Sequence, residues 1–316
     1  MRALHWNGQR LHLDLAYPLP PRQEDMALVR VHLAGICATD LHIFQGYMGF
    51  QGVPGHEFVG EVCAGPASWL GQRVVGEINF ACGQCSQCRQ GLGRHCPGRR
   101  VMGILHADGS FADYVSVPVQ NLHRVPETVT DEAAVFTEPL AAAYEILEQV
   151  AVTSATTVVV LGDGKLGLLC AQVLHNTGAR VSVLGKHPQK LAFLQQRGIH
   201  TVMLPALPAP QADVVVEASG SPTGLELALT LLRPRGTLVL KSTVSAAHTL
   251  SLAPLVINEV TVVGSRCGPF PPALQALAQQ QVSVTPLIEC TYSLTEALSA
   301  VAHATRPGAR KIMLRL

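Results

Sequence analysis

The sequence predicts an α/β protein in two parts, a mostly-β part and a part built on a doubly wound parallel sheet. Short runs with period-two alternation, such as residues 27–33, dominate the amino-terminal part. From residue 157 onward, β-branched runs alternate with helical stretches, which is the pattern of a parallel sheet. The 316 residues are 48% hydrophobic and 14% charged, which is enough for two domains with a large core.

Charge and signal features narrow the kinds of partner. The formal net charge is +1, so the chain lacks the basic surface that binds nucleic acids or acidic membranes. No secretory signal is visible at the start, and the longest apolar run, 158–173, is interrupted by Asp163 and Lys165. Nine cysteines suit a reducing compartment, as metal ligands or buried thiols. We therefore expect a cytoplasmic protein that binds a small molecule and neither nucleic acid nor a membrane.

The most specific pattern in the first part is a cysteine cluster at 80–97. Cys82, Cys85, Cys88 and Cys96 fall within fifteen residues, separated by two, two and seven residues. Thiolates at such spacings can surround one tetrahedral zinc ion, and a shell of four thiolates leaves no open position. This predicts a structural zinc site; the alternatives are a disulfide pair or four unrelated thiols.

Two further segments combine metal-ligating residue types. The first places Cys37 next to Thr39, an acid and His42, and the second is Gly55-His56-Glu57. Cys37 and His56 are too far apart for a short metal motif, so a buried thiol and a capped surface histidine remain an alternative from spacing alone.

The second part carries a nucleotide-binding loop. A buried strand at 157–161 runs into a G-x-G-x-x-G motif, and an apolar helix follows to residue 174. The glycines permit a tight turn and close approach to a pyrophosphate, and the helix N-terminus supplies N–H donors. The predicted cofactor-binding residues are Gly162, Gly164, Lys165, Leu166 and Gly167.

The next strand, 179–184, bears on the choice of cofactor. An NAD site usually has an acid at the end of this strand, which accepts hydrogen bonds from the adenine ribose. Here the chain reads Gly185-Lys186-His187, so no acid repels a 2′-phosphate and Lys186 can attract one. This predicts NADP over NAD; the alternative is a solvated Lys186 and loose specificity.

The remaining elements continue the β/α alternation. Strands are predicted at 213–220, 237–240 and 260–264, with a helix at 224–232. The Gly/Pro-rich break after residue 264 marks a return to the first part, which ends in helices at 273–281 and 295–305 and a strand at 311–316. We therefore expect one domain over 1–138 and 268–316 and another over 139–267.

The order of these motifs resembles the zinc-dependent medium-chain alcohol dehydrogenases over essentially the whole chain. The resemblance implies a GroES-like mostly-β catalytic domain, a Rossmann domain, and two zinc ions per subunit, one catalytic and one structural. It implies an NAD(P)-dependent zinc oxidoreductase that transfers a hydride between a small alcohol or polyol, or the carbonyl counterpart, and the nicotinamide. It also implies a homodimer or homotetramer.

The resemblance assigns roles to individual residues. Cys37 and His56 would be catalytic zinc ligands, with Glu57 beside the metal or intermittently on it. Thr39 would hydrogen-bond the substrate oxygen, and His42 would pass its proton to solvent.

A helix is expected to open at Asp131, and the Glu138-Pro139-Leu140 segment within it resembles the polyol and threonine dehydrogenase branch. Glu138 would then complete the catalytic zinc shell, unless it is a surface acid. Whether Glu57 or Glu138 is the resting ligand stays open.

The chain also departs from the family pattern. Gly65 comes one residue early and Gln72 replaces a usual acid, which predicts a shortened hairpin. The rival functions are a zinc-independent quinone or enoyl reductase of the same superfamily and a non-catalytic nucleotide-binding protein. A zinc-ribbon protein that binds nucleic acid is disfavoured by the near-neutral charge.

Overall fold

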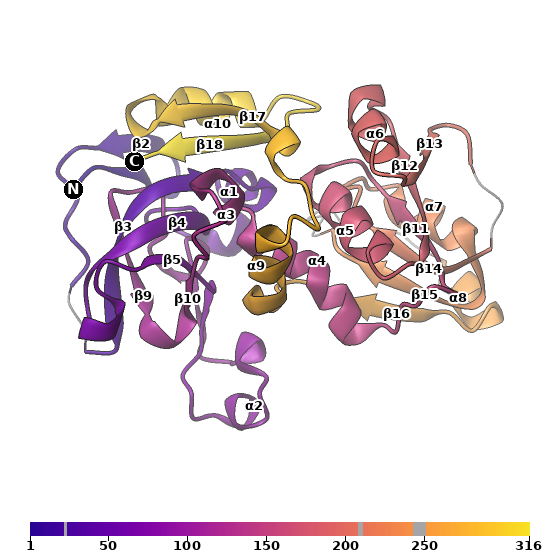
Figure 1. Cartoon of the computed structure of the whole chain (residues 1–316), viewed down its shortest axis with the longest axis horizontal. Coiled ribbons are helices and arrows are strands. Elements are labelled where there is room, and N and C mark those ends of the chain that lie inside the picture. Colours follow the sequence, from indigo (N-terminus) through magenta and orange to yellow (C-terminus); the bar gives the residue numbers. More distant parts are fainter. Residues whose placement is uncertain (22–23, 208–210, 243–250) are drawn as a thin grey trace. The chain divides into compact units, whose positions relative to one another are not determined.

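The computed structural model describes residues 1–21, 24–207, 211–242 and 251–316 and divides into two compact units (Figure 1). Unit 1 comprises Met1–Glu138 and Phe270–Leu316, and unit 2 comprises Pro139–Pro269. None of the helices within the described ranges has the length and apolar character of a membrane span.

Unit 1 is organised on a seven-stranded sheet with the order β10-β5-β4-β3-β18-β17, in which β9 also pairs with β3. Its core is built from alternating apolar positions such as Val29, Val31 and Leu33 on β3, all buried. The strands are β3 (Met26–Gly35), β4 (Glu57–Ala64), β5 (Arg73–Gly76), β9 (Tyr114–Pro118), β10 (Leu122–Arg124), β17 (Ile288–Ser293) and β18 (Lys311–Arg315).

The register of two strand pairs positions residues that are far apart in sequence. In the antiparallel β3–β4 pair, Gly35 lies opposite Glu57. On its other side the end of β3 pairs with the carboxy-terminal strand, so that Met313 of β18 also lies opposite Gly35. The end of β3, the start of β4 and the start of β18 therefore meet at one place.

Smaller elements complete unit 1. Strand β1 (Ala3–Trp6) pairs with β2 (Leu11–Asp14), and β6 (Asn79–Phe80), β7 (Arg100–Met102) and β8 (His106–Ala107) form a separate sheet. The cysteine cluster follows β6 and carries the short α2 (Ser86–Arg89); Figure 1 shows it projecting from the seven-stranded sheet. The helices are α1 (Ala38–Ile43), α3 (Asp131–Ala134), α9 (Phe270–Ala278) and α10 (Ala297–Ala304).

Unit 2 contains a six-stranded, fully parallel sheet with the order β13-β12-β11-β14-β15-β16. This order reverses direction at β11, as in a doubly wound nucleotide-binding fold, so the predicted parallel-sheet class is confirmed. The strands are β11 (Thr157–Leu161), β12 (Arg180–Gly185), β13 (His200–Met203), β14 (Ala212–Glu217), β15 (Leu232–Leu240) and β16 (Thr261–Gly264). The helices are α5 (Lys165–His175), α6 (Pro188–Gln195), α7 (Gly224–Leu231) and α8 (Ala253–Ile257).

Two predicted elements differ from the structure. The period-two alternation of residues 109–117 predicts one strand there, but the structure has only β9. The residues before β9 bond instead to the loop at 53–55, where Phe111 N donates to Pro54 O at 3.0 Å. The helix expected to open at Asp131 ends at Ala134, and α4 (Thr137–Gln149) begins afterwards. Pro139 therefore stands in a first helical turn, where a missing N–H costs little, and not in mid-helix as predicted.

Candidate metal centres and nucleotide loop

The four cysteines of the 80–97 lobe converge on one point. The Sγ atoms of Cys85 and Cys88 are 3.4 Å apart, those of Cys85 and Cys96 3.8 Å, and those of Cys82 and Cys88 4.0 Å. Four sulfurs at about 2.3 Å from a tetrahedral zinc ion would be separated by about 3.8 Å. None of the four is in a disulfide, so the structure does not support the disulfide alternative, and the donor set fits zinc.

The pKa values of two thiols in this lobe are shifted in opposite directions. Backbone N–H groups of Gln84 and Cys85 lower the pKa of Cys82 to about 6. Burial, together with the Cys85 thiol, raises the pKa of Cys88 to about 11. Crowding therefore opposes four thiolates in the absence of a cation, and a bound cation would relieve that repulsion.

A second group of ligand types lies where β3, β4 and α1 meet. One ligand atom from each of Cys37, His56 and Glu57 lies within 4.8 Å of the others. The side chains of His56 and Glu57 are only 3% and 1% exposed, and Cys37 is half-buried. The β3–β4 register explains why segments twenty residues apart in sequence meet here, because Gly35 and Glu57 are paired and Cys37 and His56 adjoin them.

Asp40 supports this group and was not assigned a role from the sequence. Its buried carboxylate accepts hydrogen bonds from the amides of Cys37 at 2.8 Å and Gly55 at 3.2 Å. Its Oδ1 also lies 3.2 Å from Nδ1 of His56. Burial lowers the pKa of His56, but the combined influence of Asp40 and Cys37 exceeds it and leaves the pKa well above its usual value. An acid three residues after the start of a helix is a capping signal that could have indicated this role.

Lys311 was also missed. Its ammonium group is 1% exposed and donates to Oε2 of Glu57, 254 positions away in sequence. Burial lowers the pKa of Lys311, but the negative charges of Glu57, Cys37 and Asp40 together exceed it and raise the pKa above its usual value. No local pattern in a strand that reads Lys-Ile-Met-Leu-Arg signals this partner.

The other predicted site residues lie as follows. Thr39 is on α1, with its hydroxyl 3.8 Å from the Cys37 sulfur. His42 is in the last turn of α1, with its ring 6.4 Å from that of Tyr47. Glu138 is half-buried in the first turn of α4 and, among the described residues, falls outside the group of three ligand types. Its role as a ligand stays a prediction.

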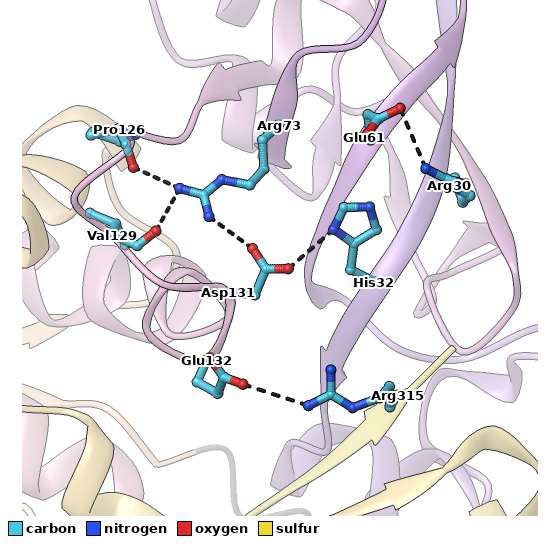
Figure 2. Close-up of polar contacts among 9 residues, drawn as sticks. All are labelled: Arg30, His32, Glu61, Arg73, Pro126, Val129, Asp131, Glu132 and Arg315. Carbon is cyan, nitrogen blue, oxygen red and sulfur yellow. Dashed lines mark hydrogen bonds and ion pairs between the residues drawn. The ribbon is translucent and has the colours of Figure 1, made fainter.

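A network of charges holds the segment that leads to α3, as Figure 2 shows. Asp131 accepts from Arg73 at 3.1 Å, and its other oxygen lies 3.1 Å from Nδ1 of His32. Arg73 also donates to the carbonyls of Pro126 and Val129, at 2.8 and 2.6 Å. These contacts tie the 126–131 segment to strands β3 and β5.

The glycine loop of unit 2 has the geometry that its motif predicts. Gly162 adopts a φ of 119°, and a Cβ on it would lie 2.6 Å from the carbonyl oxygen of Ala218. A Cβ on Gly167 would lie 2.1 Å from the carbonyl oxygen of Gly162. Both positions therefore require glycine, and α5 begins directly after Gly164, so its N-terminal amides face the loop.

The structure places an acid near the end of β12, where the sequence shows none. Asp163, from the glycine loop, accepts hydrogen bonds from the amides of Lys186 at 2.8 Å and His187 at 2.7 Å. Its Oδ1 lies 2.9 Å from Nδ1 of His187. A Cβ on Gly185 would lie 2.5 Å from Oδ2 of Asp163, so this carboxylate occupies the space of a side chain at 185. Although burial raises the pKa of Asp163, the hydrogen bonds from His187 and Lys186 lower it overall.

Both units match known families. Residues 23–127 match the alcohol dehydrogenase GroES-like domain, and residues 166–280 match the zinc-binding dehydrogenase domain. The chain belongs to the zinc-type medium-chain alcohol dehydrogenase family. The predicted GroES-like and Rossmann domain types are thereby confirmed.

Individual relatives cover nearly the whole chain. A sorbitol dehydrogenase of Halalkalibacterium halodurans is 29% identical over 99% of this chain and 98% of the relative. A D-altritol 5-dehydrogenase of Agrobacterium fabrum is 31% identical over 78% of this chain and 77% of the relative. The crystal structure of an Escherichia coli alcohol dehydrogenase (rspB) with NADH matches with a TM-score of 0.91 at 26% identity, over 100% and 99% of the two chains.

The chain is therefore an NAD(P)-dependent alcohol dehydrogenase of the zinc type. The rival functions, a zinc-independent reductase and a non-catalytic nucleotide-binding protein, are not favoured.

Proposed function

We propose that this enzyme oxidises a small alcohol or polyol, or reduces its carbonyl counterpart, at the Cys37–His56–Glu57 group. The observation that carries the proposal is the convergence of a thiol, an imidazole and a carboxylate within 4.8 Å in a largely buried place. Three protein ligands are the usual number for a catalytic zinc site, which keeps one position open. Zinc held there would supply a Lewis acid that eases deprotonation of the alcohol, and the nicotinamide would accept the hydride.

The neighbouring side chains have complementary tasks in this proposal. Thr39, beside Cys37, would hydrogen-bond the hydroxyl oxygen of the substrate. His42, one turn further along α1, would carry the released proton towards solvent. Glu57 would be the resting carboxylate ligand, and Glu138 would be available as a further one.

For the substrate class we favour polyols and sugar alcohols. The sorbitol and D-altritol dehydrogenases named above carry the names of such compounds, and the Glu138-Pro139-Leu140 segment resembles the polyol and threonine dehydrogenase branch. The test is a panel of simple alcohols, polyols and the matching aldehydes or ketones, followed at the nicotinamide absorbance with NAD and NADP. Turnover of simple alcohols alone would contradict the polyol assignment.

For the cofactor we favour NADP(H), with NAD(H) as the alternative. Residue 185 carries no acid, and Lys186 is an exposed cation at the end of β12. Asp163 already accepts from two amides and lies against the His187 ring, which limits its capacity to accept ribose hydroxyls. Measured kcat/KM values for both cofactors test this, and a strong preference for NAD would refute it.

We further propose two zinc ions per subunit, with the second, structural ion in the 80–97 lobe. The sulfur separations of 3.4 to 4.0 Å support it. Elemental analysis of the folded enzyme tests both sites, and two zinc ions per subunit are expected in wild type. If wild type held a single ion, and the variants lacking Cys37 and His56 held it as well, only the site in the lobe would remain.

The last part of the proposal concerns organisation. We assign catalysis to 1–138 with 268–316, and nucleotide binding to 139–267.

We expect a homodimer or homotetramer, since among the described residues β16 pairs on one side only and Val256 and Ile257 of α8 are 76% and 77% exposed. The thiol-rich lobe suits the reducing cytoplasm. Light scattering would test the subunit number.

A further inference from the structure

Lys311 and Glu57 form an ion pair in which both side chains are only 1% exposed. Removing two charges from water is costly, and a buried ion pair is weak evidence for a purely stabilising role. This pair also joins the carboxy-terminal strand β18 to one of the three candidate metal ligands.

The two oxygens of Glu57 are in different situations. Oε2 accepts from Lys311, whereas Oε1 is buried and accepts no hydrogen bond from any residue in the described ranges. A buried carboxylate oxygen without a donor is unfavourable unless something else satisfies it. A metal ion beside Cys37 and His56 would do so.

The surroundings keep this arrangement in place. A Cβ on Gly35 would lie 2.5 Å from Oε2 of Glu57 and 3.3 Å from Cδ of Lys311, so only glycine leaves room for the pair. The ammonium group also lies 5.5 Å from the centroid of the Phe136 ring, within the range of a cation–π contact. The pair therefore occupies a closely fitted space and is not free to separate into solvent.

We propose that Lys311 is a positioning residue that competes with the catalytic metal ion for the Glu57 carboxylate. By holding Oε2, Lys311 limits Glu57 to one weakly donating oxygen, and the positive charge reduces the donor strength of that oxygen. Glu57 would then be an exchangeable ligand of a zinc ion held there, and that ion would supply a stronger Lewis acid. The inference rests on the proposed catalytic metal site.

The test compares wild type with Lys311→Met and Lys311→Arg. In Lys311→Met the carboxylate is released, and we expect zinc to be extracted by a chelator about tenfold more slowly from the catalytic site. We expect the pH of half-maximal alcohol oxidation to rise by about one unit, because a stronger donor weakens the metal ion as a Lewis acid. The d–d absorption bands of the cobalt-substituted enzyme should change as well. Lys311→Arg keeps the positive charge, so its extraction rate, pH profile and cobalt spectrum should resemble those of wild type.

Controls separate this role from a structural one. Lys190→Met removes a lysine from α6 and should change neither extraction rate nor pH profile. If Lys311→Met does not fold, the Glu57→Gln/Lys311→Met double variant removes both charges. With Glu57→Gln as reference, loss of Lys311 should then change metal affinity by about threefold or less, since no carboxylate is released.

The outcomes are distinguishable from failure of the proposed function. Wild-type enzyme that binds no second ion would remove the catalytic metal site itself. A different result would overturn the competition while leaving the site intact. In that case wild type holds two ions, and Lys311→Met either shows an unchanged extraction rate, spectrum and pH profile or loses its metal faster.

Discussion

Oδ1 of Asp40 lies 3.2 Å from Nδ1 of His56, and both side chains are almost completely buried, at 0% and 3% exposure. Nδ1 of His56 has no hydrogen-bond partner among the described residues, so the Asp40 carboxylate faces this nitrogen as a neighbouring charge. In the proposed site, the other ring nitrogen would be left for the metal ion. Carboxylates that orient ligating histidines in this way are typical of zinc sites. The same Asp40 also accepts from the amides of Cys37 and Gly55, so one residue orders both ligand-bearing segments.

We therefore predict that Asp40→Asn lowers the affinity of the catalytic site for zinc by about 10- to 100-fold. Chelator competition measures it, and turnover should fall in parallel at limiting zinc. Asp131→Asn is the matched control, because Asp131 bonds to Arg73 and lies against His32 and not a candidate ligand. Equal losses in both variants would argue for general destabilisation.

Cys37→Ser and His56→Ala should abolish turnover and leave cofactor binding intact, because neither residue belongs to unit 2, which carries the glycine loop. Cofactor binding is followed by nicotinamide fluorescence, and turnover by absorbance. Cys63→Ser, an exposed thiol on β4, should behave as wild type. Retained turnover in either ligand variant would refute the assigned site.

Cys85→Ser should affect stability before catalysis. A closed zinc site contributes folding free energy, so we expect the melting temperature to fall by at least about 5 °C. Excess chelator should reproduce the shift in wild type and add little to the variant. A melting temperature equal to that of Cys290→Ser would contradict a structural zinc ion in the lobe.

The cofactor preference can be tested by moving the acid that lies beside Gly185. In the Asp163→Gly/Gly185→Asp double variant, the carboxylate would stand on the strand end and face the adenine ribose. The NADP/NAD ratio of kcat/KM should fall about tenfold or more, since like charges about 4 Å apart repel by ~1–4 kcal/mol. Asp163→Gly alone should weaken both cofactors without that change of ratio.

The stability of unit 2 should depend on acid through Asp213. The amide of Thr157 donates to it at 2.7 Å and Arg233 at 2.6 Å, and these bonds lower its pKa. A carboxyl whose pKa is lower in the folded state stabilises the fold above its unfolded pKa of about 3.9, and that contribution is lost as the pH falls through the folded value. The difference in melting temperature between wild type and Asp213→Asn should therefore be largest near neutral pH and shrink below about pH 3.9. A difference that is constant with pH would contradict this.

Local patterns were enough to predict several parts of the fold and site. The cysteine lobe and the glycine loop are short segments whose chemistry depends on neighbours within fifteen residues of sequence. The β-branched runs of unit 2 predicted the parallel sheet, since strands that are buried on both faces are apolar throughout. The helix predicted at 131 was wrong in its continuity, because the break before Thr137 leaves Pro139 in a first turn and periodicity does not reveal such breaks.

By itself, the sequence determined the two domain types, their order and the residue types able to hold a metal ion or a nucleotide. Only the tertiary structure decided which charges face them: Asp40 against His56, Lys311 against Glu57, and Asp163 in the space beside Gly185. The physical reason is that these contacts depend on strand register and on the absence of a Cβ at Gly35 and Gly185. Neither property leaves a periodic signal along the chain.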